Sequence, residues 1–398
     1  PPWHRLYGGM KMKCLAVTVF SIFLLFFSPL KAAALPAEEF QDTADHLPAP
    51  FDISAGAYIL MEMETGRVLA GQDIHERLAM ASTTKIMTAL LTLEQPDLDT
   101  YFTVDAKAIL VEGSSMGLLP GDQVTLRGLA VGMLLHSGND SADAAAVKVG
   151  GSTEGFVAMM NERAAEMGLA DTHFATPSGL DADDHYSSAY DMAVLAKNAL
   201  SNEDFLEICS TVKTQIAFGN PPYDRWLKNH NRLLEEYDGC IGVKTGFTKK
   251  AGRCLVSAAK RDGITLICVT LSAGDDWNVH KKLFDYGFSC VQQIDLADYL
   301  PEISLPVVGG VLDSVGAQLS GDTVTAVLQG EERKITAQVY IEPFYYAPIL
   351  PEQKIGEVQF YLGEQRLDSW DLYPKRAVEE KIAEKESFWN QVKSWFGQ

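Results

Sequence analysis

Cysteine is scarce in this chain, and the few cysteines form no pattern. Of the six, Cys14 lies near the start and the others are scattered from Cys209 to Cys290. Domains that depend on disulfides have a denser cysteine framework, so we expect these thiols to be free. The chain also lacks a C-x-x-C motif and a cluster of histidines. The sequence therefore predicts no metal site and no bound cofactor.

Positive charge is also in short supply. The chain has 33 Lys and Arg against 53 Asp and Glu, which gives a formal net charge of −20 at pH 7. Nucleic acids bind basic surfaces, so a chain this acidic is predicted to have no nucleic-acid partner. Net charge says little about the fold, since it mainly affects solubility.

Long hydrophobic runs are lacking as well. The apolar run at 14–27 has about fourteen residues, too few to span a bilayer comfortably. Lys11 and Lys13 precede it, and the small residues Ala32 and Ala34 follow it. This order is typical of a cleavable secretory signal, and an uncleaved anchor is the alternative. We predict that residues 1–34 are a signal peptide region and that the protein is secreted.

The segments after the signal alternate between strand and helix patterns. Residues 35–52 are rich in Ala, Pro and acidic residues and are interpreted as a linker. A hairpin is predicted at 57–63 and 67–70, around Glu64-Thr65-Gly66. Helical spacing is present at 82–93, 128–136, 141–149, 153–167, 188–200 and 279–291.

A second hairpin is indicated by Asp262-Gly263, which separates apolar runs at 253–260 and 264–271. A two-residue turn there places Cys268 opposite Ser257 and Cys254 opposite Leu271. Since strand side chains alternate between faces, Cys254 and Cys268 are predicted to lie on opposite faces and to form no disulfide. Strands on both sides of a helical block predict an α+β domain over residues 53–291.

The composition changes after this domain. Residues 292–376 alternate short Val, Ile, Leu and Tyr runs with Gly, Asp and Pro, which predicts a small all-β domain. From residue 377 to 398 the spacing becomes helical, and the chain has no Gly or Pro there before Gly397. The apolar positions of this predicted amphipathic helix are Val378, Ile382, Trp389, Val392 and Phe396.

Ser82-Thr83-Thr84-Lys85 is a Ser-x-x-Lys motif, which brings a hydroxyl and an amine to one helix face. Taken alone the motif is weak, because Ser28-Lys31, Ser210-Lys213 and Ser257-Lys260 also match it. Only the match at Ser82 has both partners correctly placed downstream, with Ser137-Gly138-Asn139 55 residues after Ser82 and Lys244-Thr245-Gly246 a further 107 residues on. This order is typical of penicillin-recognising enzymes with an active-site serine.

Structural interpretations of the two downstream motifs remain open at this stage. Lys244 is alternatively a solvated lysine at the end of a strand. Ser137 and Asn139 are alternatively loop residues that cap a helix starting near Ser141. His136 and His173 have no visible partner and are interpreted as ordinary polar residues.

With these motifs the chain resembles the low-molecular-mass penicillin-binding proteins that act as D-alanyl-D-alanine carboxypeptidases. The resemblance runs from about residue 57 to residue 290 and extends more weakly through the β domain. It includes Thr176-Pro177-Ser178-Gly179-Leu180-Asp181, whose turn chemistry predicts a structural role in the wall of the site. The fold that the resemblance implies is a β-lactamase/DD-peptidase-like domain, an antiparallel sheet flanked by helices.

The resemblance also implies a role for each motif residue. Ser82 would attack the carbonyl between two D-alanines, and Lys85 would take its proton, with Lys244 lowering the pKa of Lys85. Ser137 would relay the proton to the leaving amine. The implied oxyanion hole is made of the backbone N–H groups of Ser82 and Phe247. The substrate-binding residues that it implies are Asn139, Lys244, Thr245, Gly246 and Phe247.

The implied function is removal of the terminal D-alanine from peptidoglycan stem peptides, with β-lactams as covalent inhibitors. The implied location is the outer face of the cytoplasmic membrane, bound through the C-terminal helix. A β-lactamase is an alternative, although the Glu-x-x-x-Asn signature of class A enzymes is absent from residues 140–243. A non-catalytic peptidoglycan-binding scaffold is a further alternative, and release of D-alanine separates it from the enzyme.

Overall fold

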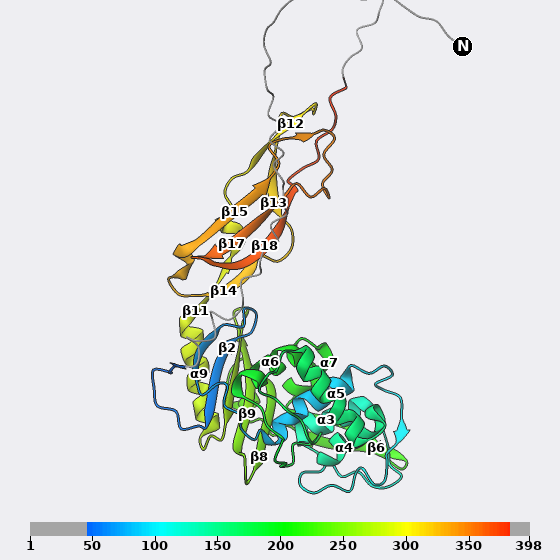
Figure 1. Cartoon of the computed structure of the whole chain (residues 1–398). Coiled ribbons are helices and arrows are strands. Elements are labelled where there is room, and N and C mark those ends of the chain that lie inside the picture. The colour runs from blue at the N-terminus through cyan, green and yellow to red at the C-terminus, as the bar shows by residue number, and fades with distance from the viewer. Residues whose placement is uncertain (1–45, 383–398) are drawn as a thin grey trace, which may run out of the picture. The chain divides into compact units, whose positions relative to one another are not determined.

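The computed structural model describes residues 46–382 (Figure 1). The predicted signal region 1–34, most of the predicted linker and residues 383–398 lie outside the described residues.

The first domain is built on an antiparallel six-stranded sheet with the strand order β1-β3-β2-β10-β9-β8. Its strands are β1 His46–Leu47, β2 Ala57–Glu62, β3 Val68–Gln72, β8 Cys240–Thr248, β9 Gly252–Arg261 and β10 Ile264–Leu271. Both predicted hairpins are confirmed, because β2 pairs with β3 and β9 with β10. Segments far apart in the sequence meet where β2 pairs with β10.

The predicted register of the second hairpin is also confirmed, since Cys268 pairs with Ser257. Cys254 belongs to the hydrophobic core on one face of the sheet, and Cys268 belongs to the core on the other. The five cysteines within the described part of the chain are free. The alternation of side chains along each strand therefore keeps these two thiols apart.

Helices cover both faces of the sheet. On one face lie α2 Lys85–Leu93, α3 Leu126–His136, α4 Asn139–Gly150, α5 Thr153–Glu166, α6 Ala189–Leu200 and α7 Glu203–Ser210, while α9 Asp276–Cys290 packs on the other (Figure 1). Ser152 and Ser188 cap α5 and α6 by accepting hydrogen bonds from the backbone N–H groups of Gly155 and Asp191. All nine residues of α2 are buried, so this helix forms the centre of the domain.

A second, four-stranded sheet was not predicted from the sequence. Its order is β4-β5-β6-β7, with β4 Phe102–Thr103, β5 Gln123–Val124, β6 Lys213–Gly219 and β7 Pro222–Lys228. The longer pair is joined by a tight turn in which Gly219 faces Pro222. The short helix α8 Leu233–Glu236 leads from β7 back to β8.

The predicted all-β domain after residue 291 is confirmed. β11 Val291–Asp295 pairs with β14 Val324–Leu328, and a six-stranded sheet has the order β15-β17-β18-β13-β12-β16. Its strands are β12 Ser304–Val308, β13 Ser314–Leu319, β15 Ile335–Ile341, β16 Tyr345–Tyr346, β17 Gly356–Leu362 and β18 Gln365–Pro374, with short 3-10 turns at Leu296–Tyr299 and Glu331–Lys334. Leu305, Val358 and Phe360 lie in its core.

The predicted start of the C-terminal helix at residue 377 is wrong. Val378 is buried and forms a β-bridge with Ile349, and Glu380 forms one with Gly310. Val378 and Ile349 exchange backbone hydrogen bonds, which use the groups that a helix would need, so these residues belong to the β domain. Ile382, which is 89% exposed, is the last described residue. The remainder of the predicted helix lies beyond the described residues.

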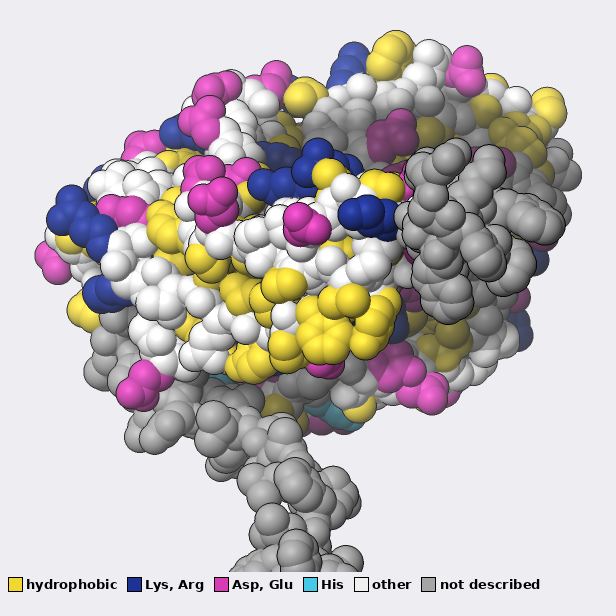
Figure 2. All heavy atoms as spheres, turned by 90° about the horizontal axis from the view of Figure 1, so that it is seen from above, with side chains coloured by type: hydrophobic (Ala, Val, Ile, Leu, Met, Phe, Trp, Pro, Cys, Tyr) yellow, Lys and Arg dark blue, Asp and Glu magenta, His cyan; other side chains and the backbone are white. Residues whose placement is uncertain are grey.

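The surface of the protein carries charges of both signs. On the face seen in Figure 2, acidic and basic side chains are interspersed around an area of hydrophobic side chains. Within residues 46–382, no helix is both long enough and apolar enough to cross a membrane.

Candidate active site

Ser82 lies on a 3-10 turn, Ala81–Thr84, that leads directly into α2. The sequence predicted a single helix from residue 82, so the first turn is tighter than expected. The hydroxyls of Thr83 and Thr84 donate to the carbonyl oxygens of Met80 and Ala81, and the turn is fixed by these local bonds. As a result Ser82 is partly exposed, whereas Lys85 is fully buried.

The amine of Lys85 is surrounded by three oxygen atoms. Its Nζ lies 3.0 Å from Ser82 Oγ, 2.7 Å from Asn139 Oδ1 and 2.5 Å from the carbonyl oxygen of Ser178. Burial lowers the pKa of Lys85 well below its ordinary value, and the nearby Lys244 ammonium is the second cause of this lowering. A neutral amine has two N–H groups and one lone pair. The amide and carbonyl oxygens accept the two hydrogens, which leaves the lone pair for the Ser82 hydroxyl.

Ser137 and Lys244 form the second pair of the site. Ser137 ends α3 with a left-handed φ of 59°, and Lys244 Nζ lies 3.1 Å from its Oγ. Lys244 also donates to the carbonyl oxygen of Thr245, at 2.8 Å. Its side chain is buried, and burial lowers the pKa of Lys244 to about 7. The interpretation of Lys244 as a solvated lysine is therefore wrong.

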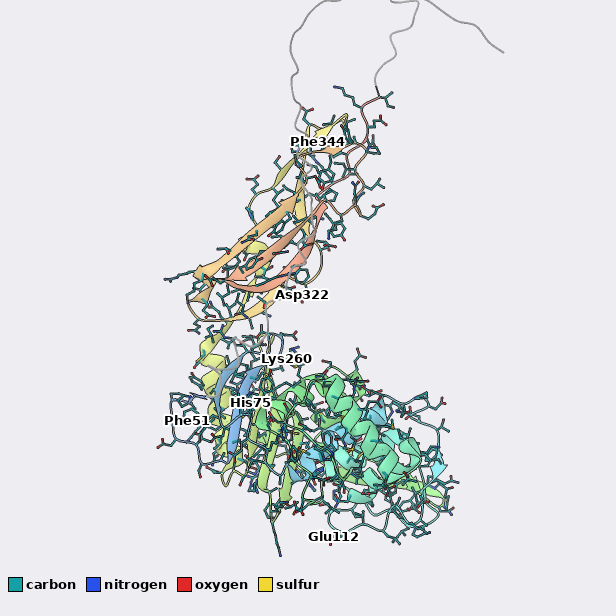
Figure 3. All side chains as sticks on the ribbon, viewed as in Figure 1. Phe51, His75, Glu112, Lys260, Asp322 and Phe344 are labelled. Atoms are coloured by element: carbon teal, nitrogen blue, oxygen red, sulfur yellow. The ribbon has the colours of Figure 1, made fainter. Side chains whose placement is uncertain are left out.

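Asn139 is the first residue of α4, and both ends of its amide are engaged. Its Oδ1 accepts from Lys85, and its Nδ2 donates to the carbonyl oxygen of Glu112, at 2.6 Å (Glu112 is labelled in Figure 3). Gly138, which precedes α4, has no side chain that could cap it, and no side-chain capping bond is made at this helix start. The capping interpretation of Ser137 and Asn139 is therefore wrong, because both side chains contact the lysines.

The loop that carries Glu112 is held in place by Asp140, a residue of the Ser137 motif to which the sequence assigned no role of its own. The Asp140 carboxylate accepts hydrogen bonds from the backbone N–H groups of Met116, Gly117 and Leu118 and from the hydroxyl of Ser115. A carboxylate that gathers several N–H donors fixes the backbone around it. Asp140 thereby positions the loop that binds the amide of Asn139.

The predicted wall segment, residues 176–181, packs directly against the turn of Ser82. Gly179 has a φ of +82°, and a Cβ there would lie 2.1 Å from the carbonyl oxygen of Ala81. Only glycine allows this close approach. The hydroxyl of Thr88 donates to the carbonyl oxygen of Pro177, at 2.6 Å. The segment does more than form a wall, because Ser178 also supplies one of the acceptors of Lys85.

His185 is a further residue that the sequence did not indicate. Its Nδ1 accepts from the backbone N–H of Ala175, so its Nε2 donates to the hydroxyl of Thr84, 2.8 Å away. Burial lowers the pKa of His185 to about 4, which keeps the ring neutral. The hydroxyl of Thr84 in turn donates a hydrogen bond to the carbonyl oxygen of Ala81. This chain of hydrogen bonds ties the turn of Ser82 to the segment before α6.

Strand β8 forms the remaining side of the site. A Cβ at Gly246 would lie 3.1 Å from the backbone nitrogen of Ser82, so the strand passes close to the turn. Phe247, the next residue, has a side chain that is 66% exposed. At the end of the strand Thr248 donates to Asp181, at 2.8 Å, which joins β8 to the wall segment. The structure thus brings the turn of Ser82, the end of α3 and strand β8 together, as the motifs predicted.

The other described Ser-x-x-Lys matches have no such surroundings. Ser210 donates to the carbonyl oxygen of Glu207, and the ammonium of Lys213 lies over the ring of Trp226. Ser257 is buried and hydrogen-bonded to His280. In both matches the serine is bonded elsewhere than to the lysine.

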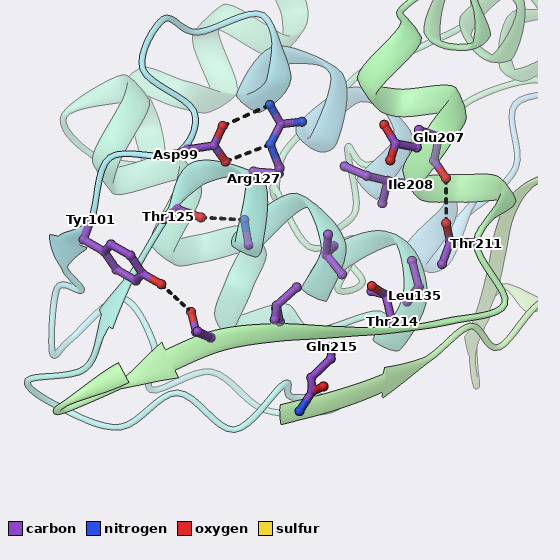
Figure 4. A pocket seen from close by; sticks show the side chains of 14 residues that line it. Asp99, Tyr101, Thr125, Arg127, Leu135, Glu207, Ile208, Thr211, Thr214 and Gln215 are labelled. Atoms are coloured by element: carbon purple, nitrogen blue, oxygen red, sulfur yellow. Dashed lines mark hydrogen bonds and ion pairs between the residues drawn. The ribbon is translucent and has the colours of Figure 1, made fainter. Parts of the chain in front are cut away.

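A separate hollow of about 430 Å³ lies between α3, α7 and β6 (Figure 4). Arg127 in its wall is bonded to Asp99, and Tyr101 donates to the carbonyl oxygen of Ala217. Ser82, Lys85 and Lys244 do not line this hollow. It is therefore distinct from the site described above.

The fold and the site define an enzyme of the serine acyl-transfer class, with a buried lysine beside the nucleophile. Residues 42–275 match the model of a family described as D-alanyl-D-alanine carboxypeptidase. Residues 303–380 match the C-terminal domain of penicillin-binding protein 5. Because the first match covers more than half of the chain, this protein belongs to the D-alanyl-D-alanine carboxypeptidase family. The resemblance stated from the motifs is confirmed.

Individual relatives agree with this assignment. The chain is 35% identical to the D-alanyl-D-alanine carboxypeptidase DacF of Bacillus subtilis over 285 residues, which are 70% of this chain and 71% of the relative. It is 32% identical to DacC of Escherichia coli over 377 residues, 90% of each chain. Penicillin-binding protein 5 from Haemophilus influenzae has a similar structure, with a TM-score of 0.64 and 28% identity over 83% of this chain and 99% of that one.

Proposed function

We propose that this protein is a serine-type D-Ala-D-Ala carboxypeptidase that removes the terminal D-alanine from peptidoglycan stem pentapeptides, with Ser82 as its nucleophile. The observation that carries the proposal is the position of Lys85 Nζ, 3.0 Å from Ser82 Oγ in a buried site. Family membership supports a cell-wall enzyme that acts outside the cytoplasm and is acylated by β-lactams. It does not favour a β-lactamase or a non-catalytic scaffold.

In the acylation step Ser82 Oγ attacks the carbonyl carbon between the two D-alanines while Lys85 takes the hydroxyl proton. The developing oxyanion is held by the backbone N–H groups of Ser82 and Phe247. The proton that Lys85 took is relayed through Ser137, which Lys244 polarises, to the leaving amine as the C–N bond breaks, so Lys85 is neutral again and Ser137 keeps its hydroxyl. The terminal carboxylate of the substrate is held by Thr245 next to Lys244. The products of this step are free D-alanine and an ester on Ser82.

In the second step water attacks the ester and Lys85 takes a proton from it. The C–O bond to Ser82 breaks, and the serine recovers its proton. Asn139 orients Lys85 throughout and lies where it can contact the substrate amide. Gly246 keeps β8 close enough to the Ser82 turn for both oxyanion donors to face one atom.

The direct test of the function is incubation with a synthetic stem pentapeptide and assay of free D-alanine. We expect one D-alanine per peptide and no release from the matching tetrapeptide, which lacks the terminal residue. A β-lactam added first should suppress the release, because it occupies the same serine. A protein that binds the pentapeptide without releasing D-alanine would support the scaffold instead.

Membrane attachment is proposed for the end of the chain. Tyr346, 68% exposed, contacts the ring of Phe344 and pairs with the exposed Val308 (Phe344 is labelled in Figure 3). The backbone N–H of Lys381 donates to the carbonyl oxygen of Gly309, so the chain leaves the β domain beside these side chains. Aromatic rings favour the membrane interface, and the tail that follows is rich in them. We propose that the tail binds the outer face of the cytoplasmic membrane as an amphipathic helix.

Truncation after Ile382 is expected to release the protein from lipid vesicles while leaving activity on soluble pentapeptide intact. The cut is placed there because Val378 is buried in the β domain. The measurement is sedimentation with vesicles of zwitterionic lipid, since the acidic start of the tail gives no attraction to anionic lipid. The double variant Trp389→Ser/Trp395→Ser should also be released, and the control Asn390→Ser/Gln391→Ser should still sediment. A truncated form that still sediments would contradict the tail as the anchor.

A further inference from the structure

Asp143 is a partly buried carboxylate that the reaction described above does not use. It lies on α4 one turn after Asn139, so both side chains project from the same face of the helix. Asn139 Oδ1 accepts from Lys85, and the carbonyl oxygen of Ser178 accepts from the same amine. The side chain of Ser178 interacts with Asp143 and favours its ionised form. Asp143 therefore adjoins both groups that hold Lys85.

One oxygen of this carboxylate has no hydrogen-bond partner. Asp143 Oδ2 is buried and unpaired among the residues that the structure describes. Burying a carboxylate without full compensation costs free energy, so such a group calls for an explanation beyond packing. The cost of burying this oxygen is offset in part by the attraction between the charges of Asp143 and Lys85.

We propose that Asp143 is a positioning residue whose charge, acting through Lys85, sets the pH above which that lysine accepts the proton of Ser82. The inference rests on the proposed role of Lys85 as the base.

The charged groups around the pair come from three elements. Lys85 on α2 faces Asp143 and Asp140 on α4, and Lys244 on β8 faces Lys85. Burial and the Lys244 ammonium lower the pKa of Lys85, while the two carboxylates raise it. Asp140 accepts hydrogen bonds from several backbone N–H groups. Asp143 has no such set of donors, and it is the carboxylate whose pKa burial raises toward neutral pH.

The sign of the effect follows from these charges. Burial raises the pKa of Asp143 to about 6. Above that pH the carboxylate is ionised and stabilises the ammonium form of Lys85, which delays formation of the free amine. Below it the carboxyl is neutral and the stabilisation is lost. Asp143 thus raises the pKa of Lys85, whereas Lys244 lowers it. Removing the charge of Asp143 should therefore make Lys85 available as a base at lower pH.

The experiment measures the second-order rate of Ser82 acylation by a fluorescent penicillin as a function of pH. For Asp143→Asn we expect the acidic limb of the profile to move to lower pH by about one unit. This is the change expected in the pKa of Lys85 when one nearby opposite charge is removed. Within that limb the variant should be acylated about tenfold faster than the wild type. The two profiles should meet below about pH 5, where Asp143 is neutral in the wild type as well.

Two further variants separate charge from packing. Asp143→Glu keeps the charge and should return the limb toward the wild-type position. Glu154→Gln removes one exposed negative charge from α5 and should leave the profile unchanged. A limb that does not move, or a rate lowered by the same factor at every pH, would overturn the proposal. If Asp143→Asn does not fold, Asp143→Ala also removes the charge and carries the same expected shift.

Failure of this inference is distinguishable from failure of the proposed function. If Lys85 is not the base, the acidic limb in the wild type persists when Lys85 is replaced. If Lys85 is the base and Asp143 has no influence, the limb depends on Lys85 and is identical in wild type and Asp143→Asn.

Discussion

Replacing Ser82 by alanine is expected to abolish D-alanine release and covalent labelling by penicillin together. The substitution removes the only atom to which the acyl group is attached in the proposed mechanism, so the loss should be at least about 10⁴-fold in rate. Ser82 is partly exposed on its turn and is not part of the hydrophobic core, so the fold should persist. The measurement is peptide mass mapping after incubation with a β-lactam, alongside the D-alanine assay.

The matched control is Ser210→Ala, which alters another Ser-x-x-Lys match. Ser210 ends α7, and its hydroxyl donates to the carbonyl oxygen of Glu207. This variant should be labelled and should release D-alanine at the wild-type rate. An adduct found on Ser210 or Ser257 in the wild-type protein would refute the assignment of Ser82.

Replacing Lys85 by arginine is expected to reduce the rate of acylation by about 10²–10⁴-fold, the contribution of general-base catalysis. Arginine keeps the positive charge but does not lose its proton at working pH. In the wild type, burial and Lys244 favour the neutral amine, and two oxygen acceptors leave its lone pair for Ser82. The measurement is the rate of penicillin labelling, compared at matched pH.

The control for this substitution is Lys260→Arg, an exposed lysine on β9 that should tolerate the change. A guanidinium is larger than an ammonium, and Lys85 is fully buried, so the melting temperature of the variant must be measured as well. A second variant, Lys85→Met, tests the base without added bulk or charge and should show the same loss. Acylation near the wild-type rate in either folded variant would disprove the role of Lys85.

The sequence predicted much of the framework of the catalytic domain. The apolar runs on either side of Asp262-Gly263 predicted the hairpin, and a two-residue turn at Asp262-Gly263 predicted its register. Helices α5 and α6 were predicted because residues 153–167 and 188–200 have helical spacing, and the structure shows them capped by Ser152 and Ser188. The four-stranded sheet was missed. The strands β4 and β5 have two residues each, and their pairing depends on contacts between distant segments.

The end of the chain was predicted with the wrong boundary for a similar reason. Val378 and Ile382 have helical spacing, but Val378 lies in the core of the β domain and forms a β-bridge with Ile349. Burial of an apolar side chain and a β-bridge outweigh a weak local helix preference. Helical spacing alone does not reveal whether such a segment forms a helix or pairs with a distant segment of the chain.

The sequence by itself determined the chemical identity of the site, since Ser82, Lys85, Ser137 and Lys244 were found in motifs whose order along the chain is informative. The tertiary structure alone decided which of their neighbours complete it. The carbonyl oxygen of Ser178 and the carboxylate of Asp143 carry no recognisable signal, because any residue has a carbonyl group and a helical aspartate is usually solvated. The Ser178 carbonyl oxygen accepts from Lys85, and Asp143 interacts electrostatically with it, because α2, α4 and the segment at 176–181 pack together. The pKa of a buried lysine depends on the charges and dipoles within a few ångströms, and folding, not local sequence, places them there.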